Sequence, residues 1–139
     1  MIMYPARIWK ESNTSYSVEF PDLPGCFSSG RSLAEAKVHA EEALTAYLES
    51  LDSRRITIPE ASCISGPDMY PVAPPLNVSF AIALKQEREK LGLTQKEVAQ
   101  KMGVAWSAYQ RIENPRKTNP TLSTIEKLQK VFGRPFFAF

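Results

Sequence analysis

The chain has 139 residues, of which 43% are hydrophobic and 23% charged, and its formal net charge is +2. Its two cysteines, Cys26 and Cys63, lie far apart and form neither a CxxC motif nor a Cys/His cluster, which argues against a zinc site and a disulfide framework. No apolar run approaches the length of a membrane span, and the N-terminus lacks the apolar core of a signal peptide. We therefore expect a cytoplasmic protein with no membrane partner, no metal and no cofactor.

The small net charge conceals two halves of opposite sign. Residues 1–75 hold 6 Lys and Arg against 10 Asp and Glu, a net charge of −4, whereas residues 76–139 hold 11 against 5, a net charge of +6. This division suggests two partners of different charge, and the basic half suits a polyphosphate backbone. We predict one domain over residues 1–75 and a second over residues 76–139, joined by the stiff connector Pro74-Pro75.

The first half follows a pattern of three strands, a helix and a further strand. Strands are expected over residues 3–10, 16–20, 26–29 and 69–73, the last at a sheet edge. Ser32 is placed to cap a long helix, with Glu35 as its capping-box partner. The stripe that should lie across the sheet consists of Leu33, Ala36, Ala40, Ala43, Tyr47 and Leu51.

The second half is expected to be helical. A first helix spans about Phe80 to Leu91 and stops at Gly92. Thr94 then caps a short helix, and Glu97, three residues later, completes a capping box. Gly103 follows at a position where a left-handed turn needs no Cβ, so the chain is expected to turn tightly there.

Another short helix follows the glycine turn. It carries Tyr109 and Ile112 inward, and Asn114-Pro115 ends it because proline disfavours the α region for the residue before it. A last helix ends at Gly133. The residues of this helix that are expected mostly in the core are Leu122, Ile125, Leu128 and Val131.

Two short helices with this cap, apolar spacing and glycine turn resemble the Cro/cI-type helix-turn-helix family, over about Ser79 to Gly133. In such domains the second helix enters the major groove of DNA. A helical hairpin that only packs is the alternative. The resemblance implies that bases are contacted by Trp106, Ser107, Gln110 and Arg111, with Arg111 suited to guanine and Gln110 to adenine. It implies phosphate or backbone contacts by Gln95, Asn114, Arg116, Lys117 and Asn119.

Three further features of this half bear on its assembly. Trp106 departs from the small polar or basic residues usual at its position, and it either touches a thymine methyl group or a sugar, or packs against a partner. Arg88 and Glu113 match family positions that often form an intradomain ion pair. One helix-turn-helix covers little DNA, so we expect a homodimer, or a tetramer, on a palindromic operator. The apolar tail Phe136–Phe139 is expected to pair between protomers; packing onto its own helices is the alternative.

The first half carries a second resemblance. The runs Phe20-Pro-Asp-Leu-Pro-Gly25 and Gly30-Arg-Ser-Leu-Ala-Glu-Ala36, followed by a helix through Ala43–Leu48, resemble the HicB antitoxin family over about Met1 to Pro75. The resemblance implies a partial RNase H-like fold and a HicA-type toxin partner, a small basic protein that cleaves mRNA. The expected class is therefore α+β, a β-β-β-α-β domain followed by an all-α helix-turn-helix domain. The resemblance assigns no toxin-contacting residue to this chain.

An enzyme is the least favoured interpretation. Two-metal phosphoryl chemistry needs several convergent carboxylates, and the expected sheet offers only Glu11, Glu19 and Asp22. His39 and Cys26 have no evident partner for nucleophilic catalysis, so we name no catalytic residue. The sequence therefore predicts the antitoxin of a type II HicA/HicB system that inhibits its toxin and represses its own operon. The alternatives are a regulator whose first half senses a small ligand, and an RNA-processing enzyme.

Overall fold

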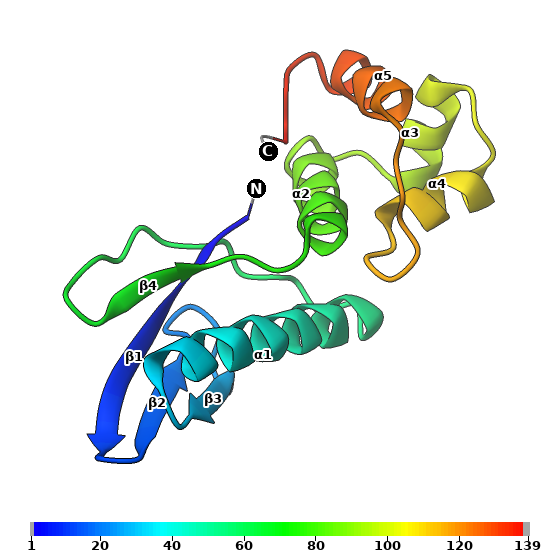
Figure 1. Ribbon diagram of the computed structural model, residues 1–139. Coiled ribbons are helices and arrows are strands. Elements are labelled where there is room, and N and C mark those ends of the chain that lie inside the picture. The colour runs from blue at the N-terminus through cyan, green and yellow to red at the C-terminus, as the bar shows by residue number, and fades with distance from the viewer. Residues whose placement is uncertain (1, 138–139) are drawn as a thin grey trace. The chain divides into compact units, whose positions relative to one another are not determined.

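The computed structural model describes residues 2–137 (Figure 1), and its contacts separate the chain into two compact units. One unit runs from Ile2 to Pro75, and the other begins at Leu76. Among the described residues, no helix combines the length and the apolar character that crossing a membrane requires. All residues predicted to contact DNA lie in the unit that begins at Leu76.

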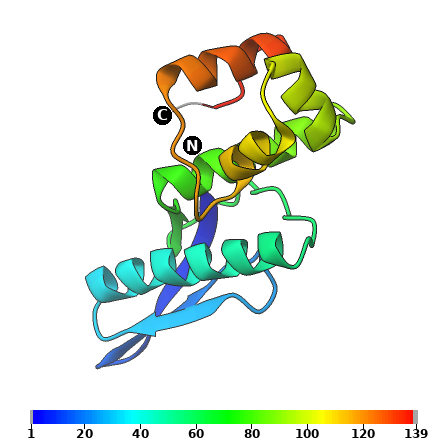
Figure 2. The same ribbon diagram turned by 90° about the vertical axis from the view of Figure 1, so that its right-hand side faces the viewer.

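The first unit is an antiparallel sheet covered by one helix. Its elements are β1 (Tyr4–Ser12), β2 (Ser15–Glu19), β3 (Phe27–Gly30), α1 (Leu33–Ser53) and β4 (Met69–Val72). The four strands lie in the order β3-β2-β1-β4, and each neighbouring pair is antiparallel. Helix α1 contacts all four strands and runs across one face of the sheet (Figures 1 and 2). The predicted β-β-β-α-β order is confirmed.

The sheet buries one face because its apolar residues alternate along the strands. Tyr4, Ala6 and Ile8 of β1 are buried whereas Arg7 is exposed, and Ile8 lies opposite the buried Val18 of β2. The Tyr4 hydroxyl donates a hydrogen bond of 2.6 Å to the carbonyl oxygen of Pro59, which follows α1 in the chain. The long segment between α1 and β4 is therefore attached to the core of the sheet.

Helix α1 begins at the predicted cap, Ser32, but the carboxylate of Glu35, the expected capping-box partner, pairs with Arg31 Nε at 3.4 Å, and the helix buries a shifted stripe. The Ser32 hydroxyl accepts a hydrogen bond of 3.1 Å from the Glu35 N–H, which confirms the cap. The buried residues of the helix are Ala36, Ala40, Leu44, Leu48 and Leu51. The prediction of Leu33, Ala43 and Tyr47 in this stripe is wrong, since all three are half-buried. From Ala36 to Leu48 the buried residues follow one another at intervals of four. Because the helix has 3.6 residues per turn, this spacing moves the buried face gradually around the helix axis, and after Ala40 the face consists of leucines.

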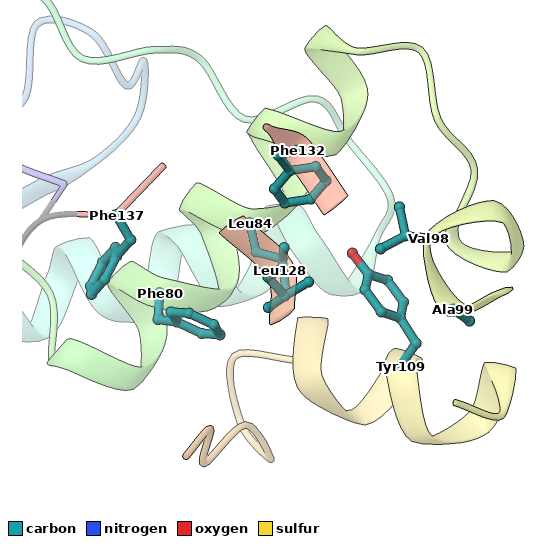
Figure 3. Packing of buried hydrophobic residues seen from close by; sticks show 8 residues of the cluster. All are labelled: Phe80, Leu84, Val98, Ala99, Tyr109, Leu128, Phe132 and Phe137. Atoms are coloured by element: carbon teal, nitrogen blue, oxygen red, sulfur yellow. The ribbon is translucent and has the colours of Figure 1, made fainter. Parts of the chain in front are cut away.

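The second unit consists of α2 (Leu76–Lys90), α3 (Gln95–Met102), α4 (Trp106–Glu113) and α5 (Leu122–Phe132). These helices and the C-terminal segment each contribute side chains to one core, whose packing Figure 3 shows. Its buried members are Phe80, Leu84, Val98, Ala99, Tyr109, Leu128, Phe132 and Phe137. This core fixes α3 and α4 against α2 and α5.

Two expectations about the helices of this unit are wrong. Helix α2 begins at Leu76 rather than Phe80, and its residues from Val78 to Ile82 are all buried, so no amphipathic pattern marks its start. Leu122 was expected mostly in the core, but it is 79% exposed. It occupies the first position of α5, whereas the buried residues of that helix, Leu128 and Phe132, lie further along.

The C-terminal segment packs onto its own unit. The Phe137 ring meets the Phe80 ring edge-on at a centroid separation of 5.4 Å, and Phe136 lies 5.4 Å from Phe132 and 5.8 Å from Phe80. The structure thus shows the alternative, packing onto its own helices, for the buried Phe137 and the half-buried Phe136, and pairing of the tail between protomers stays a prediction. The remainder of the predicted tail, residues 138–139, lies outside the described residues.

Candidate nucleic-acid interface

Local sequence signals set the geometry of α3 and of the turn after it. The Thr94 hydroxyl accepts a hydrogen bond of 3.1 Å from the Glu97 N–H, and the Glu97 carboxylate accepts one of 3.2 Å from the Thr94 N–H. Gly103 adopts φ 72° and ψ 30°, a left-handed conformation that favours glycine. Helix α4 then runs from Trp106 to Glu113, and Asn114 follows it as the C-cap, before Pro115. The predicted capping box, glycine turn and second helix are confirmed.

A buried carboxylate fastens α4 to the rest of the unit. Glu113 is 4% exposed, and Arg88 of α2 binds it through two hydrogen bonds, Nε to Oε2 at 2.8 Å and Nη2 to Oε1 at 2.7 Å. Within α4, the Tyr109 hydroxyl donates to Glu113 Oε2 at 2.6 Å. From α3, Gln95 Nε2 donates to Oε1 at 3.1 Å. The predicted Arg88–Glu113 ion pair is confirmed. It joins α2 to α4, and the hydrogen bond from Gln95 adds α3.

These contacts keep Glu113 ionised. Burial is the strongest single influence on its pKa and opposes ionisation, but the hydrogen bonds from Arg88, Tyr109 and Gln95, with the charge of Arg88, together lower the pKa below the ordinary 4.5. The pKa of Tyr109 is raised by its own burial and by the adjacent carboxylate, so the phenol remains a hydrogen-bond donor. Glu113 and Arg88 are therefore both charged, and their ion pair holds the end of α4 against α2.

Trp106 and Gln95 are held by contacts within the unit. The Trp106 indole N–H donates to Gln95 Oε1 at 3.4 Å, and Lys96 Nζ lies 4.5 Å from the centroid of the Trp106 ring. Trp106 nevertheless remains 45% exposed. The Gln95 amide thus reaches Glu113 with its nitrogen and Trp106 with its oxygen. These contacts orient the first side chain of α4 from the preceding helix.

The outward face of α4 carries the other predicted base contacts. Ser107, Gln110 and Arg111 are all exposed, whereas Tyr109 is fully buried in the core. This face offers a hydroxyl, an amide and a guanidinium, and the last two have the paired geometry that base edges in the major groove require. The structure therefore brings Trp106, Ser107, Gln110 and Arg111 together on one helix.

The segment after α4 carries the predicted backbone contacts. Asn114 Oδ1 accepts from the Arg116 N–H at 3.0 Å, and the Asn114 carbonyl accepts from Lys117 and Thr118 at 3.0 and 2.9 Å. Asn77 Nδ2 of α2 donates to the Pro115 carbonyl at 3.2 Å, which anchors the turn. Arg116, Lys117 and Asn119 are exposed. The turn thus presents two cations beside the end of α4.

Sequence reasoning missed two parts of this site. Lys96 was not among the predicted residues, and nothing in the local sequence signals its contact with Trp106, which lies on another helix. The Tyr109–Glu113 hydrogen bond was also missed, although its spacing of four residues places both side chains on one helix face. Both omissions concern residues that orient α4 rather than residues on its outward face.

The candidate catalytic groups lie apart from one another. Glu11 accepts from the Trp9 indole at 2.7 Å, and Asp22 accepts from the N–H and hydroxyl of Ser62 at 2.8 and 3.0 Å. His39 Nδ1 lies 2.7 Å from the Ser29 carbonyl oxygen. Among residues 2–137, no three His, Cys, Asp or Glu side chains form a potential metal cluster.

Cys26 is a structural thiol. It lies just before β3 and is buried, and its Sγ lies 3.7 Å from the carbonyl oxygen of Ala43 in α1. Burial raises the pKa of this thiol to about 11, so it is protonated at neutral pH. A protonated thiol is a weak nucleophile, and the packing role is the one that its contacts support.

Comparisons with known proteins agree with the two units. A model described as a HicB-like antitoxin of bacterial toxin-antitoxin systems matches residues 4–71, and a helix-turn-helix model matches residues 84–139. The UPF0150 protein Ta0767 of Thermoplasma acidophilum is 41% identical over 56 residues, which are 40% of this chain and 81% of that protein.

Two further relatives bear the name of this antitoxin class. A chain from the solved HicA3 and HicB3 toxin-antitoxin complex is 32% identical and covers 48% of this chain and 73% of that chain, with a TM-score of 0.39. Antitoxin HicB of Escherichia coli K12 is 26% identical over 131 residues, which are 94% of each chain. The chain therefore carries a HicB-like antitoxin domain in its first half and a Cro/cI-type helix-turn-helix domain in its second half.

Proposed function

We propose that this chain is the antitoxin of a type II HicA/HicB pair, in which residues 1–75 bind and inhibit a HicA-type mRNA-cleaving toxin. Residues 76–139 bind the operator of the same operon and repress it. The observation that carries the proposal is the union of a HicB-like half of net charge −4 with a helix-turn-helix half of net charge +6. An acidic half attracts a basic toxin, and complementary charge mainly speeds association.

The geometry of the second unit supports the DNA-binding part of this proposal. Glu113, held by Arg88, keeps α4 in a fixed position, and the exposed Ser107, Gln110 and Arg111 face away from the core. Gln95, Asn114, Arg116, Lys117 and Asn119 are proposed to bind the DNA backbone and Trp106 to lie at the groove edge. A homodimer on a palindrome, alone or within a tetramer, would place two such helices in successive major grooves.

The experiment that tests the whole function is co-expression with the small basic protein encoded beside this chain. We expect that protein alone to arrest growth, and we expect this chain to relieve the arrest and to co-purify with it. Relief of growth arrest without a complex would contradict direct inhibition. Arg111→Ala serves as a separating variant, because it should still relieve growth arrest while losing repression of a reporter placed behind the operon's own promoter.

Arg111→Ala should relax sequence specificity. Loss of a bidentate contact to guanine is expected to cost about 1–3 kcal/mol on the cognate operator and little on random DNA. Fluorescence anisotropy with labelled duplexes at fixed salt measures both affinities. Arg31→Ala removes another exposed arginine, in the first unit, and should leave both affinities unchanged. Equal weakening on cognate and random DNA would refute base readout by Arg111.

Lys117→Ala should weaken binding to every sequence by a similar factor. If Lys117 contacts a phosphate, its loss releases one fewer counterion, and the slope of log affinity against log salt should fall by about one. Lys10→Ala, in β1, removes an exposed lysine from the other unit and should leave the slope unchanged. A slope that stays the same in Lys117→Ala would remove this residue from the phosphate contacts.

A further inference from the structure

Trp106 is the first residue of α4, the helix that the proposed function places on DNA, and it is 45% exposed. Gln110 lies one helical turn further along, so the two side chains share a face of α4. Tyr109, between them in the sequence, is instead buried in the core. The outward face of α4 therefore presents an aromatic ring beside an amide.

The polar group of the Trp106 side chain is already bound within the unit. Gln95 Nε2 donates to Glu113 at 3.1 Å, and because an ionised carboxylate only accepts hydrogen bonds, the amide nitrogen has to face Glu113. The amide oxygen is then left for Trp106, whose indole N–H donates to it at 3.4 Å. An indole has one donor and no acceptor. Trp106 thus has no hydrogen-bonding group left for the edge of a base.

Lys96 holds the Trp106 ring over one of its faces. Its Nζ lies 4.5 Å from the ring centroid, within the range of a cation–π interaction. Gln95 and Lys96 are neighbours at the start of α3, so both contacts with the ring come from the same helix. Apart from its nitrogen, the indole consists of carbon and hydrogen, and the surface that it leaves exposed is therefore apolar. The ring is oriented before any contact with DNA is made.

The edges of the bases in the major groove offer one group that suits an apolar ring. Adenine, guanine and cytosine present hydrogen-bonding groups there, whereas thymine also presents its 5-methyl group. The first residues of the second helix in a helix-turn-helix are the ones that reach base edges. From these contacts, we infer that Trp106 reads the 5-methyl group of one thymine in each half-site, next to the base that Gln110 contacts. Gln95 and Lys96 are its positioning residues. This role of Trp106 rests on the proposed binding of operator DNA.

The test replaces each thymine of the operator by uracil, one position at a time and in both half-sites. Uracil lacks only the 5-methyl group and keeps every hydrogen-bonding group of thymine, so the replacement isolates the apolar contact. Fluorescence anisotropy with the full chain at fixed salt should find a position where uracil weakens binding about fourfold per half-site, the effect of withdrawing one methyl-sized group from burial. Trp106→Ala should bind the thymine and uracil duplexes equally at that position, which is the coupling that a double-mutant cycle measures.

The positioning residues are tested by the same preference for thymine over uracil. Gln95→Met and Lys96→Met each keep a side chain of similar length while removing one of the two contacts with the ring. Each should reduce the preference, because the ring is then free to leave the methyl group. Lys101→Met removes an exposed lysine from the other end of α3 and should keep the full preference, whatever it does to affinity for both duplexes. Circular dichroism melts should show that all these variants fold.

Trp106 fluorescence provides a second measurement, in a Trp9→Phe background that leaves a single tryptophan. Acrylamide should quench this fluorescence readily in the free protein and much less in the complex with the operator. A ring that is already protected in the free protein would lie against a partner protomer instead of being available to DNA, and this result would overturn the assignment.

Failure of methyl readout and failure of operator binding give different results. A wild type that binds the operator tightly but tolerates uracil at every position would overturn the role of Trp106 and leave operator binding standing. A contact with a sugar would give this result, because the replacement leaves the sugar unchanged. A preference for thymine that persists in Trp106→Ala would also overturn the role, since another residue would then read the methyl group. A wild type that binds operator and random DNA equally would instead refute operator binding, and the role of Trp106 with it.

Discussion

Glu113→Ala should lower the free energy of unfolding of the helix-turn-helix unit by about 3–5 kcal/mol, the range for removing one partner of a buried ion pair. The substitution leaves Arg88, whose side chain is 12% exposed, without its carboxylate, and it removes the acceptor of Tyr109 and Gln95 as well. Urea unfolding followed by Trp106 fluorescence, in a Trp9→Phe background that leaves a single tryptophan, measures the loss in this unit alone.

Glu126→Ala is the control for this prediction. Glu126 pairs with Lys130 at 3.3 Å, but both side chains are mostly exposed, at 69% and 76%. Exposed pairs contribute about 0–1 kcal/mol, so this variant should unfold almost as the wild type does. Similar losses in Glu113→Ala and Glu126→Ala would contradict a structural role for the buried pair.

The same carboxylate predicts how stability depends on pH. Because hydrogen bonds from Arg88 and Tyr109 lower the pKa of Glu113 in the folded chain, its contribution is fully present above the unfolded pKa, ordinarily 4.5. That contribution is lost as the pH falls through the lower folded value. The difference in unfolding free energy between wild type and Glu113→Ala should therefore be constant near neutral pH and shrink on acidification below 4.5. A difference that grows on acidification would contradict this sign.

The parts of the fold that could be predicted are those with short-range signals. The cap of α3 joins Thr94 to a residue three positions later, and the turn after α3 depends on a single glycine, Gly103. The contacts of Trp106 carry no such signal, because Gln95 and Lys96 approach it from the preceding helix. The outward face of α4 was therefore predictable, whereas the residues that orient its first side chain were not.

The misplacement of Leu122 has a different cause. Helical periodicity identifies Leu122 and Ile125 as neighbours on one apolar face, but it does not show which other segment covers that face. Phe137 packs edge-on against Phe80, so the C-terminal segment supplies core side chains that the pattern had assigned to α5. The start of α5 consequently remains outside the core. A local sequence pattern does not show which of two distant segments, here the C-terminal segment and the start of α5, fills the core.

The shifted stripe of α1 shows the same limit on a smaller scale. The apolar periodicity identified the buried side of the helix correctly near its start. Further along it placed Ala43 and Tyr47 on that side, whereas the buried residues are Leu44 and Leu48, each one position later. Tyr47 instead donates from its hydroxyl to the Pro24 carbonyl at 2.7 Å, a contact with a loop far away in the sequence. The start of the helix also lies close to Gly30, at the end of β3.

Gly30→Ala should destabilise the first unit by about 3 kcal/mol, at the upper end of the usual range for overpacking. An added Cβ at Gly30 would lie 2.4 Å from the Ala36 N, 2.8 Å from the Ala36 Cα and 2.9 Å from the Glu35 carbonyl carbon. These are backbone atoms of the first turns of α1, so no side-chain rotation relieves the clash. The end of β3 and the start of α1 must separate, which would expose Ala36 and Ala40 beneath the helix.

Gly25→Ala separates this steric effect from the loss of glycine as such. Gly25 has φ 86° and no atom within 4 Å of an added Cβ, so alanine there meets only the left-handed strain of about 1–2 kcal/mol. Unfolding followed by Trp9 fluorescence in a Trp106→Phe background reports on the first unit for both variants. If the toxin binds the unit formed by α1 and the sheet, Gly30→Ala should also lose toxin neutralisation. The Gly30→Ala variant that retains both tryptophans should still bind operator DNA. A larger loss of stability in Gly25→Ala than in Gly30→Ala would show that backbone conformation, and not the close approach of α1, limits this unit.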